Sequence, residues 1–416
     1  MASLNRPAGC LMLLALLSRS ATAQPDRPPL PPADTVYVGT LITMERDAPV
    51  AEAIAVRGEV IVAVGSTRDM MRWRGRNTRI VQLGRSALLP GFIDAHGHLT
   101  ATAAVARYAN LASPPSGAVR SMKDLQEAIR RQMARVPSPD QWVVGFGYDD
   151  SLIAEKRHPT RADLDAISTS RPIFLVHVSA HISVANSRLL ALAGIDASTP
   201  DPVGGVIRRE TGSLEPNGVL EEAAHMGLYA RMPQPAAKEE LSLLTTALDT
   251  YARSGITTVQ DGAASAENLA LLTQAAKLKF LKLDVVAYRL WLAAKAPFPA
   301  ELAFGNYVNR LKIGGVKIIL DGSPQAKTAW LSEPYLVPPP GQPATYRGYP
   351  TMTQEVVARA AHEALSRHVP LLAHANGDAA EQSLLDAVAA ARRDTLDTTT
   401  PVVMIHAQTV RDDQLD

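Results

Sequence analysis

The alternation of short apolar segments with helical segments between residues 256 and 406 most restricts the fold of this chain. Each apolar segment is continuous, which is typical of parallel strands buried on both faces. Five such segments occupy residues 256–260, 283–288, 316–320, 369–374 and 401–406. With an earlier segment at residues 88–98, they supply about six units of an eight-unit barrel. We therefore predict an α/β fold built on a (β/α)8, TIM-type barrel.

The earlier segment ends in two histidines one residue apart. Phe92 and Ile93 are suited to a buried strand. His96 and His98 follow at the end of that strand, and residues i and i+2 of a strand point to the same face, so both imidazoles are expected to converge on one metal ion. Gly97 removes a side chain where other groups must approach. Alone, such a pair is more often two solvated histidines at a polar strand end.

Three further strand segments carry a potential metal ligand. Lys317 lies within one segment, and His374 and His406 end two others. The carboxyl ends of the strands of a (β/α)8 barrel meet at one mouth, so residues far apart in the sequence can converge there. Neutral imidazole is a good ligand for zinc and similar ions. Each of these histidines could instead be a core residue whose ring is satisfied by the backbone.

Lys317 is the least usual of these residues, because its neighbours in sequence are apolar. A buried ammonium costs several kcal/mol unless it is paired or neutralised. One explanation is a salt bridge, to Asp321 or to an acidic residue of a neighbouring strand. The other is carboxylation, which makes the side chain anionic and able to bind metal. Composition does not choose between them.

The N-terminus has the three parts of a secretory signal: a positive residue at Arg6, a short apolar run, and a small-x-small site at residues 21–23. We expect residues 1–23 to be removed and the protein to be secreted or periplasmic; an uncleaved, disordered tail is the alternative. Residues 24–34 read as a proline-rich linker. Cys10 is the only cysteine, so the mature chain would offer no thiol to a metal.

Two other regions flank the barrel segments. Residues 35–87 contain short strands separated by turn residues, which indicates a small antiparallel β-module. Residues 101–250 depart from simple strand–helix alternation, and we interpret them as an insertion that caps or walls a pocket, with Trp142, Phe146 and Tyr148 as candidate lining residues. The formal net charge of +1, without charge blocks, argues against nucleic acid as a partner. The N-terminal apolar run is too short to span a bilayer, so no membrane partner is expected after cleavage.

These motifs together resemble the amidohydrolase superfamily, and most of all its YtcJ-like branch, which includes N-substituted formamide deformylases. The resemblance covers nearly all of the mature chain and follows the order of the family. The matching segments are residues 89–98, 255–262, 316–317, 321–323, 374–380 and 405–408 and, within the insertion, residues 159–165, 181 and 186–187.

The resemblance implies a metal-dependent hydrolase barrel over residues 88–416, beside a β-sandwich whose N-terminal part is residues 35–87. It implies one or two divalent ions, with zinc as the first candidate, and carboxylation of the lysine where two ions are bridged. The implied metal ligands are His96, His98, Lys317, His374 and His406. A metal lowers the pKa of bound water to about 7, so the implied reaction is attack of metal-activated hydroxide on an amide-like C–N bond of a small molecule. His181 could contact the substrate, or be a satisfied loop histidine. The oligomeric state is left open, and a homo-oligomer is compatible with the sequence.

One departure from the family pattern concerns the end of the chain. The family places a metal-binding, proton-shuttling aspartate after the eighth barrel strand, and Asp412, Asp413 and Asp416 follow His406 too closely to be that residue. The last two barrel units and the returning sandwich strands are also missing, which would expose strand edges that parallel sheets rarely tolerate. We therefore expect a truncated chain. The alternatives are a non-catalytic remnant, or the same barrel with ester hydrolase or isomerase activity.

Overall fold

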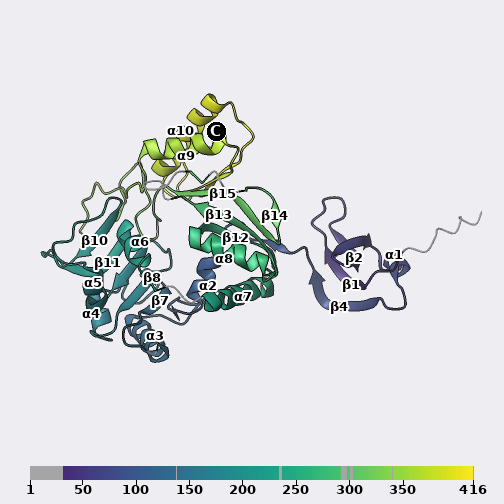
Figure 1. Ribbon diagram of the computed structural model, residues 1–416, viewed down its shortest axis with the longest axis horizontal. Coiled ribbons are helices and arrows are strands. Elements are labelled where there is room, and N and C mark those ends of the chain that lie inside the picture. The colour runs from purple at the N-terminus through teal and green to yellow at the C-terminus, as the bar shows by residue number, and fades with distance from the viewer. Residues whose placement is uncertain are drawn as a thin grey trace, which may run out of the picture. The chain divides into compact units, whose positions relative to one another are not determined.

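The computed structural model describes residues 31–136, 138–233, 237–291, 298–299, 303–339 and 341–415 (Figure 1). Two compact units divide the chain at Pro90 and Gly91. The predicted signal peptide, and the linker up to residue 30, lie outside the described residues. Within the described part, none of the helices combines the length and apolar character that a membrane crossing requires.

The first unit contains one four-stranded sheet with the order β3-β2-β1-β4. Its elements are β1 (Thr35–Ile42), β2 (Val50–Arg57), β3 (Val60–Gly65), α1 (Thr67–Met70), the 3-10 turn η1 (Met71–Trp73) and β4 (Arg79–Leu88). Strands β1, β2 and β3 are antiparallel, as predicted, but β4 pairs parallel to β1, so the prediction of a purely antiparallel module was wrong. The sandwich remains a prediction.

The second unit is organised around a parallel sheet with the order β17-β16-β15-β13-β12-β5. Its strands are β5 (Phe92–Ile93), β12 (Ile256–Ala264), β13 (Asp284–Leu290), β15 (Leu311–Ile319), β16 (Leu371–Ala375) and β17 (Val402–His406). Every neighbouring pair is parallel, so the carboxyl ends share one edge. All five apolar segments from the sequence are strands here, and the sheet fits half of a barrel.

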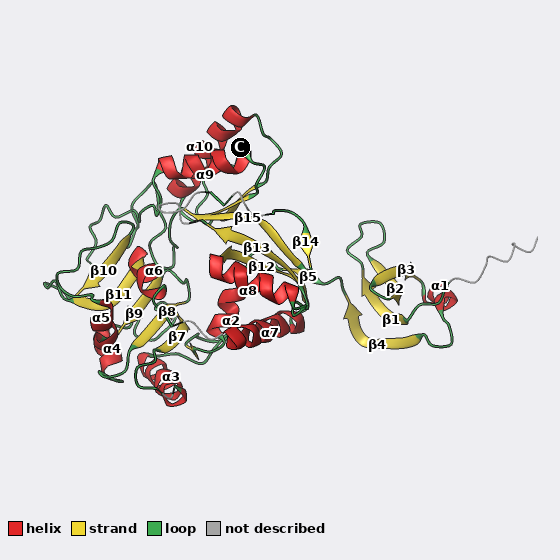
Figure 2. Cartoon of the chain, in the orientation of Figure 1, coloured by secondary structure: helices red, strands yellow, loops and turns green. Residues whose placement is uncertain are grey.

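Helices cover this sheet because their apolar faces pack against its continuous apolar strands. They are α2 (Leu99–Val105), α7 (Ala237–Arg253), α8 (Ala266–Lys277), α9 (Gln354–Ser366) and α10 (Asp378–Thr395). Figure 2 shows β12, β13 and β15 side by side, with α7 and α8 along them. Two short elements complete this part, β14 (Tyr307–Val308), which pairs antiparallel to β15, and the 3-10 turn η2 (Asp412–Gln414). Val316 and Ile318 of β15 are fully buried with Ala361 and Leu365 of α9.

The inserted region forms a second sheet with the order β10-β11-β9-β8-β7-β6 (Figure 1). Its strands are β6 (Ala109–Asn110), β7 (Val143–Tyr148), β8 (Ile173–His177), β9 (Ile182–Ala185), β10 (Gly205–Arg209) and β11 (Pro216–Glu222). Its helices are α3 (Met122–Arg135), α4 (Arg161–Asp165), α5 (Ser187–Ala193) and α6 (Ala223–Tyr229). Strands β6, β7 and β8 are parallel to one another, whereas β8, β9, β11 and β10 pair antiparallel.

Two local expectations were wrong. Strand β5 ends at Ile93, so His96 and His98 lie after the strand and not on it. Phe92 and Ile93 are 51% and 74% exposed, because β5 lies at the edge of this sheet and, among the described strands, is paired with β12 alone. Trp142 and Phe146, which we considered as pocket residues, pack against the hydrophobic core of the inserted sheet.

Candidate active site

The structure brings the predicted ligand residues together at the carboxyl edge of the parallel sheet. The ring centroids of His96 and His98 are 5.1 Å apart, those of His96 and His406 are 5.4 Å apart, and those of His374 and His406 are 4.6 Å apart. Lys317, on β15, lies close enough for its charge to act on all four imidazoles. Residues from four strand ends therefore meet in one cluster, as the topology of a parallel sheet requires.

His96 and His98 converge through a bend and not through strand geometry. After β5, the chain bends at Ala95 and His96, and His98 forms a bridge with Asp261 just before α2 begins. Gly97 is required at this bend, because a Cβ there would lie 2.2 Å from a carboxylate oxygen of Asp94. The close approach expected at Gly97 is therefore confirmed, although the backbone that creates it was not foreseen.

Gln260 fixes the orientation of the His96 ring. The Nδ1–H of His96 donates to Gln260 Oε1 at 2.7 Å, while Gln260 Nε2 donates to the backbone oxygen of Ala95 at 3.3 Å. Gly262 leaves the space for this arrangement, since a Cβ there would lie 2.6 Å from His96 Cε1. With Nδ1 engaged, Nε2 carries the lone pair, and this buried atom makes no hydrogen bond. A buried nitrogen of this kind suits a metal ligand.

His374 is oriented in a comparable way by the backbone. Its Nε2 lies 2.9 Å from the carbonyl oxygen of Gly322 and 3.0 Å from Nδ2 of Asn376, so neighbouring polar groups occupy this nitrogen and Nδ1 faces away from them. Burial lowers its pKa well below the usual value, so the ring is neutral at neutral pH. A backbone carbonyl that holds one ring nitrogen of a histidine is the usual support for a metal-binding imidazole.

Lys317 is only 2% exposed, and this burial lowers its pKa to about 7. Asp321, the salt-bridge partner considered from the sequence, is engaged elsewhere. It accepts backbone N–H groups from Trp330, Asn376 and Gly377. Its Oδ1 also lies 3.7 Å from His374 Nε2. The amine of Lys317 is therefore held among the imidazoles of the cluster.

The other two imidazoles are also held in the neutral form. Loss of hydration lowers the pKa of His98 to about 4 and that of His406 to about 4, and the nearby charge of Lys317 adds to both shifts. Both residues are nevertheless exposed, so the loss of hydration is only partial. His406 has φ of +79°, a left-handed backbone that is uncommon outside glycine and often marks functional positions. The neutral ring is the form that binds metal.

The inserted sheet brings His181 to this cluster. Its ring centroid lies 5.0 Å from that of His374, and its Nδ1 pairs with Glu222 Oε2 at 2.8 Å. Burial alone would lower the pKa of His181, but the adjacent Glu222 carboxylate outweighs this and raises it. Glu222 has φ of +46°, and Gly322 is the residue whose missing side chain accommodates its Oε1. The substrate contact predicted for His181 remains a prediction.

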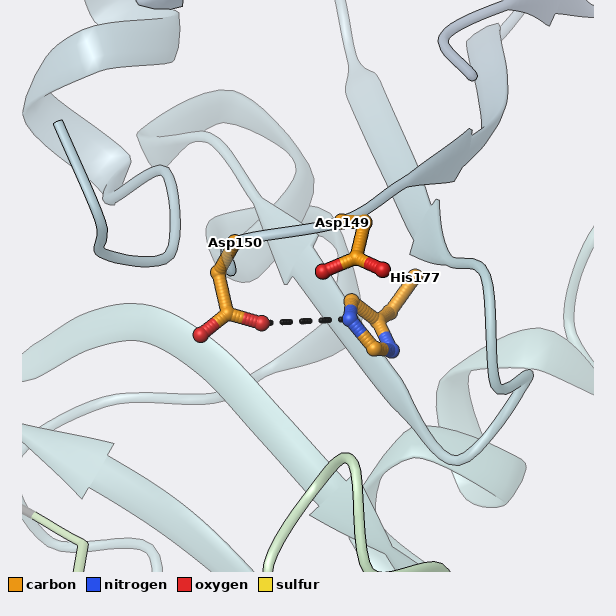
Figure 3. A group of neighbouring side chains, drawn as sticks. All are labelled: Asp149, Asp150 and His177. Atoms are coloured by element: carbon orange, nitrogen blue, oxygen red, sulfur yellow. Dashed lines mark ion pairs between the residues drawn. The ribbon is translucent and has the colours of Figure 1, made fainter. Parts of the chain in front are cut away.

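A second cluster was missed by the sequence reasoning. Among the described residues, the group of His and carboxylate side chains whose ligand atoms all lie within 4.8 Å of one another is Asp149, Asp150 and His177 (Figure 3). Asp149 and Asp150 follow β7, and His177 ends the neighbouring parallel strand β8. The rule that identified His374 and His406, a ligand at the end of a strand, would have found them had we applied it to the insertion.

Comparisons with known proteins agree with the fold and the motifs. The model of the amidohydrolase family matches residues 80–416. An N-substituted formamide deformylase from Arthrobacter pascens is 33% identical over 229 residues, which cover 54% of this chain and 41% of that protein. The putative amidohydrolase YtcJ from Bacillus subtilis (strain 168) is 27% identical over 367 residues, which cover 84% of this chain and 64% of that protein. The chain therefore spans less than two thirds of the length of either relative.

A solved structure supports the fold independently of sequence identity. The crystal structure of an uncharacterized metal-dependent hydrolase from Pyrococcus horikoshii OT3 superposes with a TM-score of 0.64 at 23% identity, covering 92% of this chain and 71% of that one. The family match extends over most of the chain, from β4 through all six parallel strands and the inserted sheet. The chain belongs to the amidohydrolase family.

Proposed function

We propose that this chain forms the metal-binding part of a hydrolase that cleaves an amide-like C–N bond of a small molecule. The observation that carries the proposal is the convergence of His96, His98, His374 and His406 around Lys317. Because the relative from Arthrobacter pascens is an N-substituted formamide deformylase, N-substituted formamides, or similarly small amides, are the first substrates to test.

The residues of the cluster fit a divalent ion. His96 Nε2 is buried without a hydrogen bond, and His374 Nε2 is occupied by the Gly322 carbonyl and the Asn376 amide, so His96 Nε2 and His374 Nδ1 are the nitrogens that would bind metal. Neutral nitrogen donors without a thiol suit zinc and similar ions. When bound, such an ion supplies hydroxide near neutral pH and polarises a carbonyl group.

Lys317 is proposed to be carboxylated when metal is bound. An ammonium on the buried Lys317 would repel a divalent cation bound by the neighbouring imidazoles. A carbamate at the same position carries a negative charge and two oxygen donors. The burial of Lys317, and the engagement of Asp321 by backbone groups, support this assignment over a salt bridge.

His181 is the residue that we propose contacts the substrate. Its Nδ1 pairs with Glu222, so Nε2 is the nitrogen that can hydrogen-bond a substrate carbonyl or leaving amine. The fixed ring orientation would place that N–H beside the ligand cluster without a rearrangement, because Glu222 is itself buried on β11.

The test is replacement of His96 or His98 by Asn, with the exposed helical residue His362 replaced by Asn as a matched control. Activity is measured on the whole protein, because the chain covers only part of its relatives. Loss of an ion that supplies several kcal/mol of transition-state stabilisation should lower hydrolysis of an N-substituted formamide by about a thousandfold. Added zinc should also cease to raise the melting temperature. Full activity in either variant would contradict the proposal.

A further inference from the structure

The turn between β8 and β9 presents His181 to the histidine cluster. Strand β8 ends at His177 and β9 begins at Ile182, so the turn consists of residues 178–181. Within it, Ala180 has φ of +58°, in the left-handed region that residues other than glycine adopt only where neighbouring groups hold them. The contacts of the turn therefore decide where His181 lies.

Backbone hydrogen bonds tie both sides of this turn to neighbouring strands. The N–H of Val178 donates to the carbonyl oxygen of Tyr148, at the end of β7, at 2.9 Å. The carbonyl oxygen of His181 accepts the N–H of Glu222, at the end of β11, at 2.9 Å. Neither of these bonds engages the N–H of His181, which is left for a side chain to satisfy.

The hydroxyl of Ser179 satisfies that group. Its Oγ accepts the N–H of His181 at 3.3 Å. The same Oγ lies 2.8 Å from Nδ1 of His177, and this nitrogen also accepts the backbone N–H of Ser179 at 3.2 Å. Because Nδ1 is an acceptor, the hydroxyl hydrogen of Ser179 points to it. The hydroxyl therefore donates to His177 and accepts from His181, which fixes its orientation at both ends.

Asp150 in turn fixes the ring of His177. The ring is fully buried and, with Nδ1 as acceptor, carries its proton on Nε2, which lies 3.2 Å from Asp150 Oδ1 (Figure 3). Burial raises the pKa of Asp150, but the contact with His177 and the nearby ring of His158 outweigh this effect, so the carboxyl is ionised at neutral pH. A chain of contacts thus runs from the end of β7 to the backbone of His181.

We propose that Asp150, His177 and Ser179 are positioning residues that hold His181 in place for reaction with the substrate. The carboxylate keeps the proton on Nε2, so Nδ1 stays an acceptor, and the hydroxyl then keeps a lone pair directed at the His181 N–H. Glu222 holds the ring of His181 from the other side, at 2.8 Å. This inference rests on the proposed function, because it assumes that His181 contacts the substrate.

The first experiment compares Ser179→Ala with Ser179→Thr in the whole protein, with an N-substituted formamide as substrate. Loss of the hydroxyl should lower kcat about tenfold, since small displacements of a positioned group cost up to about 100-fold. KM and the zinc content should stay unchanged, because alignment acts mainly in the transition state. Ser179→Thr keeps a hydroxyl and should restore most of kcat.

A double replacement tests whether the residues act as one chain. Asp150→Ala should lower kcat, because the ring of His177 is then free to move its proton to Nδ1 and lose the Ser179 hydroxyl as donor. Combining it with Ser179→Ala should lower kcat no further than Ser179→Ala alone, since Asp150 acts through Ser179. Losses that multiply would show that the two residues act independently and would contradict the chain.

Hydrogen exchange at the backbone N–H of His181 supplies a readout that does not depend on activity. Ser179→Ala removes the acceptor of this group and should speed its exchange by roughly tenfold, as expected for loss of one hydrogen bond. The matched control is Ser187→Ala on α5, which removes a hydroxyl that donates to Asp165 in the same region. That variant should change neither kcat nor the exchange of His181.

Three results would overturn the proposal: unchanged kcat and exchange in the folded Ser179→Ala variant, a loss of kcat that Ser179→Thr does not restore, or an equal loss in Ser187→Ala. If circular dichroism shows that Ser179→Ala does not fold, Asp150→Ala takes its place in both measurements. A parent protein that hydrolyses no amide would refute the proposed function instead, and the exchange of His181 would still decide whether the chain holds the turn.

Discussion

The histidine cluster and the Asp149–Asp150–His177 cluster occupy the same topological position in two different sheets. Both lie at the carboxyl ends of parallel strands, where the chain must turn and side chains from neighbouring strands meet. In both, a hydrogen bond fixes one nitrogen of a buried ring: Gln260 for His96, and Ser179 for His177. Strand topology therefore gathers potential ligands wherever parallel strands end.

The two clusters differ in charge. The first gathers four neutral imidazoles around a lysine, so it has no anion of its own and depends on a modified Lys317 to balance a cation. The second presents two carboxylates to one imidazole. We infer that the first is suited to chemistry at a bound ion, whereas in the second the carboxylate of Asp150 is already paired with the His177 ring.

The largest expected effect comes from Lys317→Met. This replacement should abolish tight zinc binding at the first cluster. It should also raise the free energy of unfolding of the metal-free, unmodified chain at pH 7 by several kcal/mol, because a lysine with a folded pKa of about 7 and an unfolded value of 10.5 opposes folding there.

The sign of the pH dependence follows from the same values. Between pH 7 and pH 10.5, Lys317 tends to hold its proton in the unfolded chain and to lose it in the folded chain. The free energy of unfolding therefore rises as the pH increases through this window. Denaturant unfolding at pH 7 and pH 9 measures it. Because of Lys317, the free energy of unfolding of the parent chain should be higher at pH 9 than at pH 7. Lys317→Met should remove this contribution. A variant less stable than the parent at pH 7 would contradict the assignment.

The next effect concerns Gln260, which orients His96. Gln260→Leu removes the acceptor for Nδ1–H and should weaken zinc binding at the first cluster by about 10–100-fold. Gln260→Glu keeps an acceptor at the same position and should retain most of the affinity. Equilibrium dialysis of both variants against zinc, beside the parent chain, measures the affinity. Equal losses in the two variants would mean that Gln260 acts through packing alone.

The smallest effect involves a buried carboxyl outside both clusters. Burial raises the pKa of Glu381, on α10, from 4.5 to about 7. The protonated carboxyl therefore contributes fully to the free energy of unfolding below pH 4.5. This contribution is lost as the pH rises through 7. Glu381→Gln should therefore flatten the change in melting temperature between pH 5 and pH 8. An unchanged slope would contradict this role of Glu381.

Several features were predictable because they depend on local patterns. Continuous apolar segments between residues 256 and 406 marked five strands of the parallel sheet, and strand topology then required Lys317, His374 and His406 to share an edge. Other features were not. The bend that brings His96 to His98 depends on Asp94 packing against Gly97, and the partly buried Trp142 and Phe146 pack against the core of the inserted sheet.

The sequence by itself determined the family, the strand order along the chain and the identity of the residues at the first cluster, because each of these follows from residue types at fixed spacings. Only the tertiary structure decided which nitrogen of each ring is free, that Asp321 is occupied by backbone N–H groups, and that Asp149 and Asp150 face His177. The physical reason is that hydrogen-bond direction and burial depend on groups far apart in the sequence, which approach one another only when the sheets form.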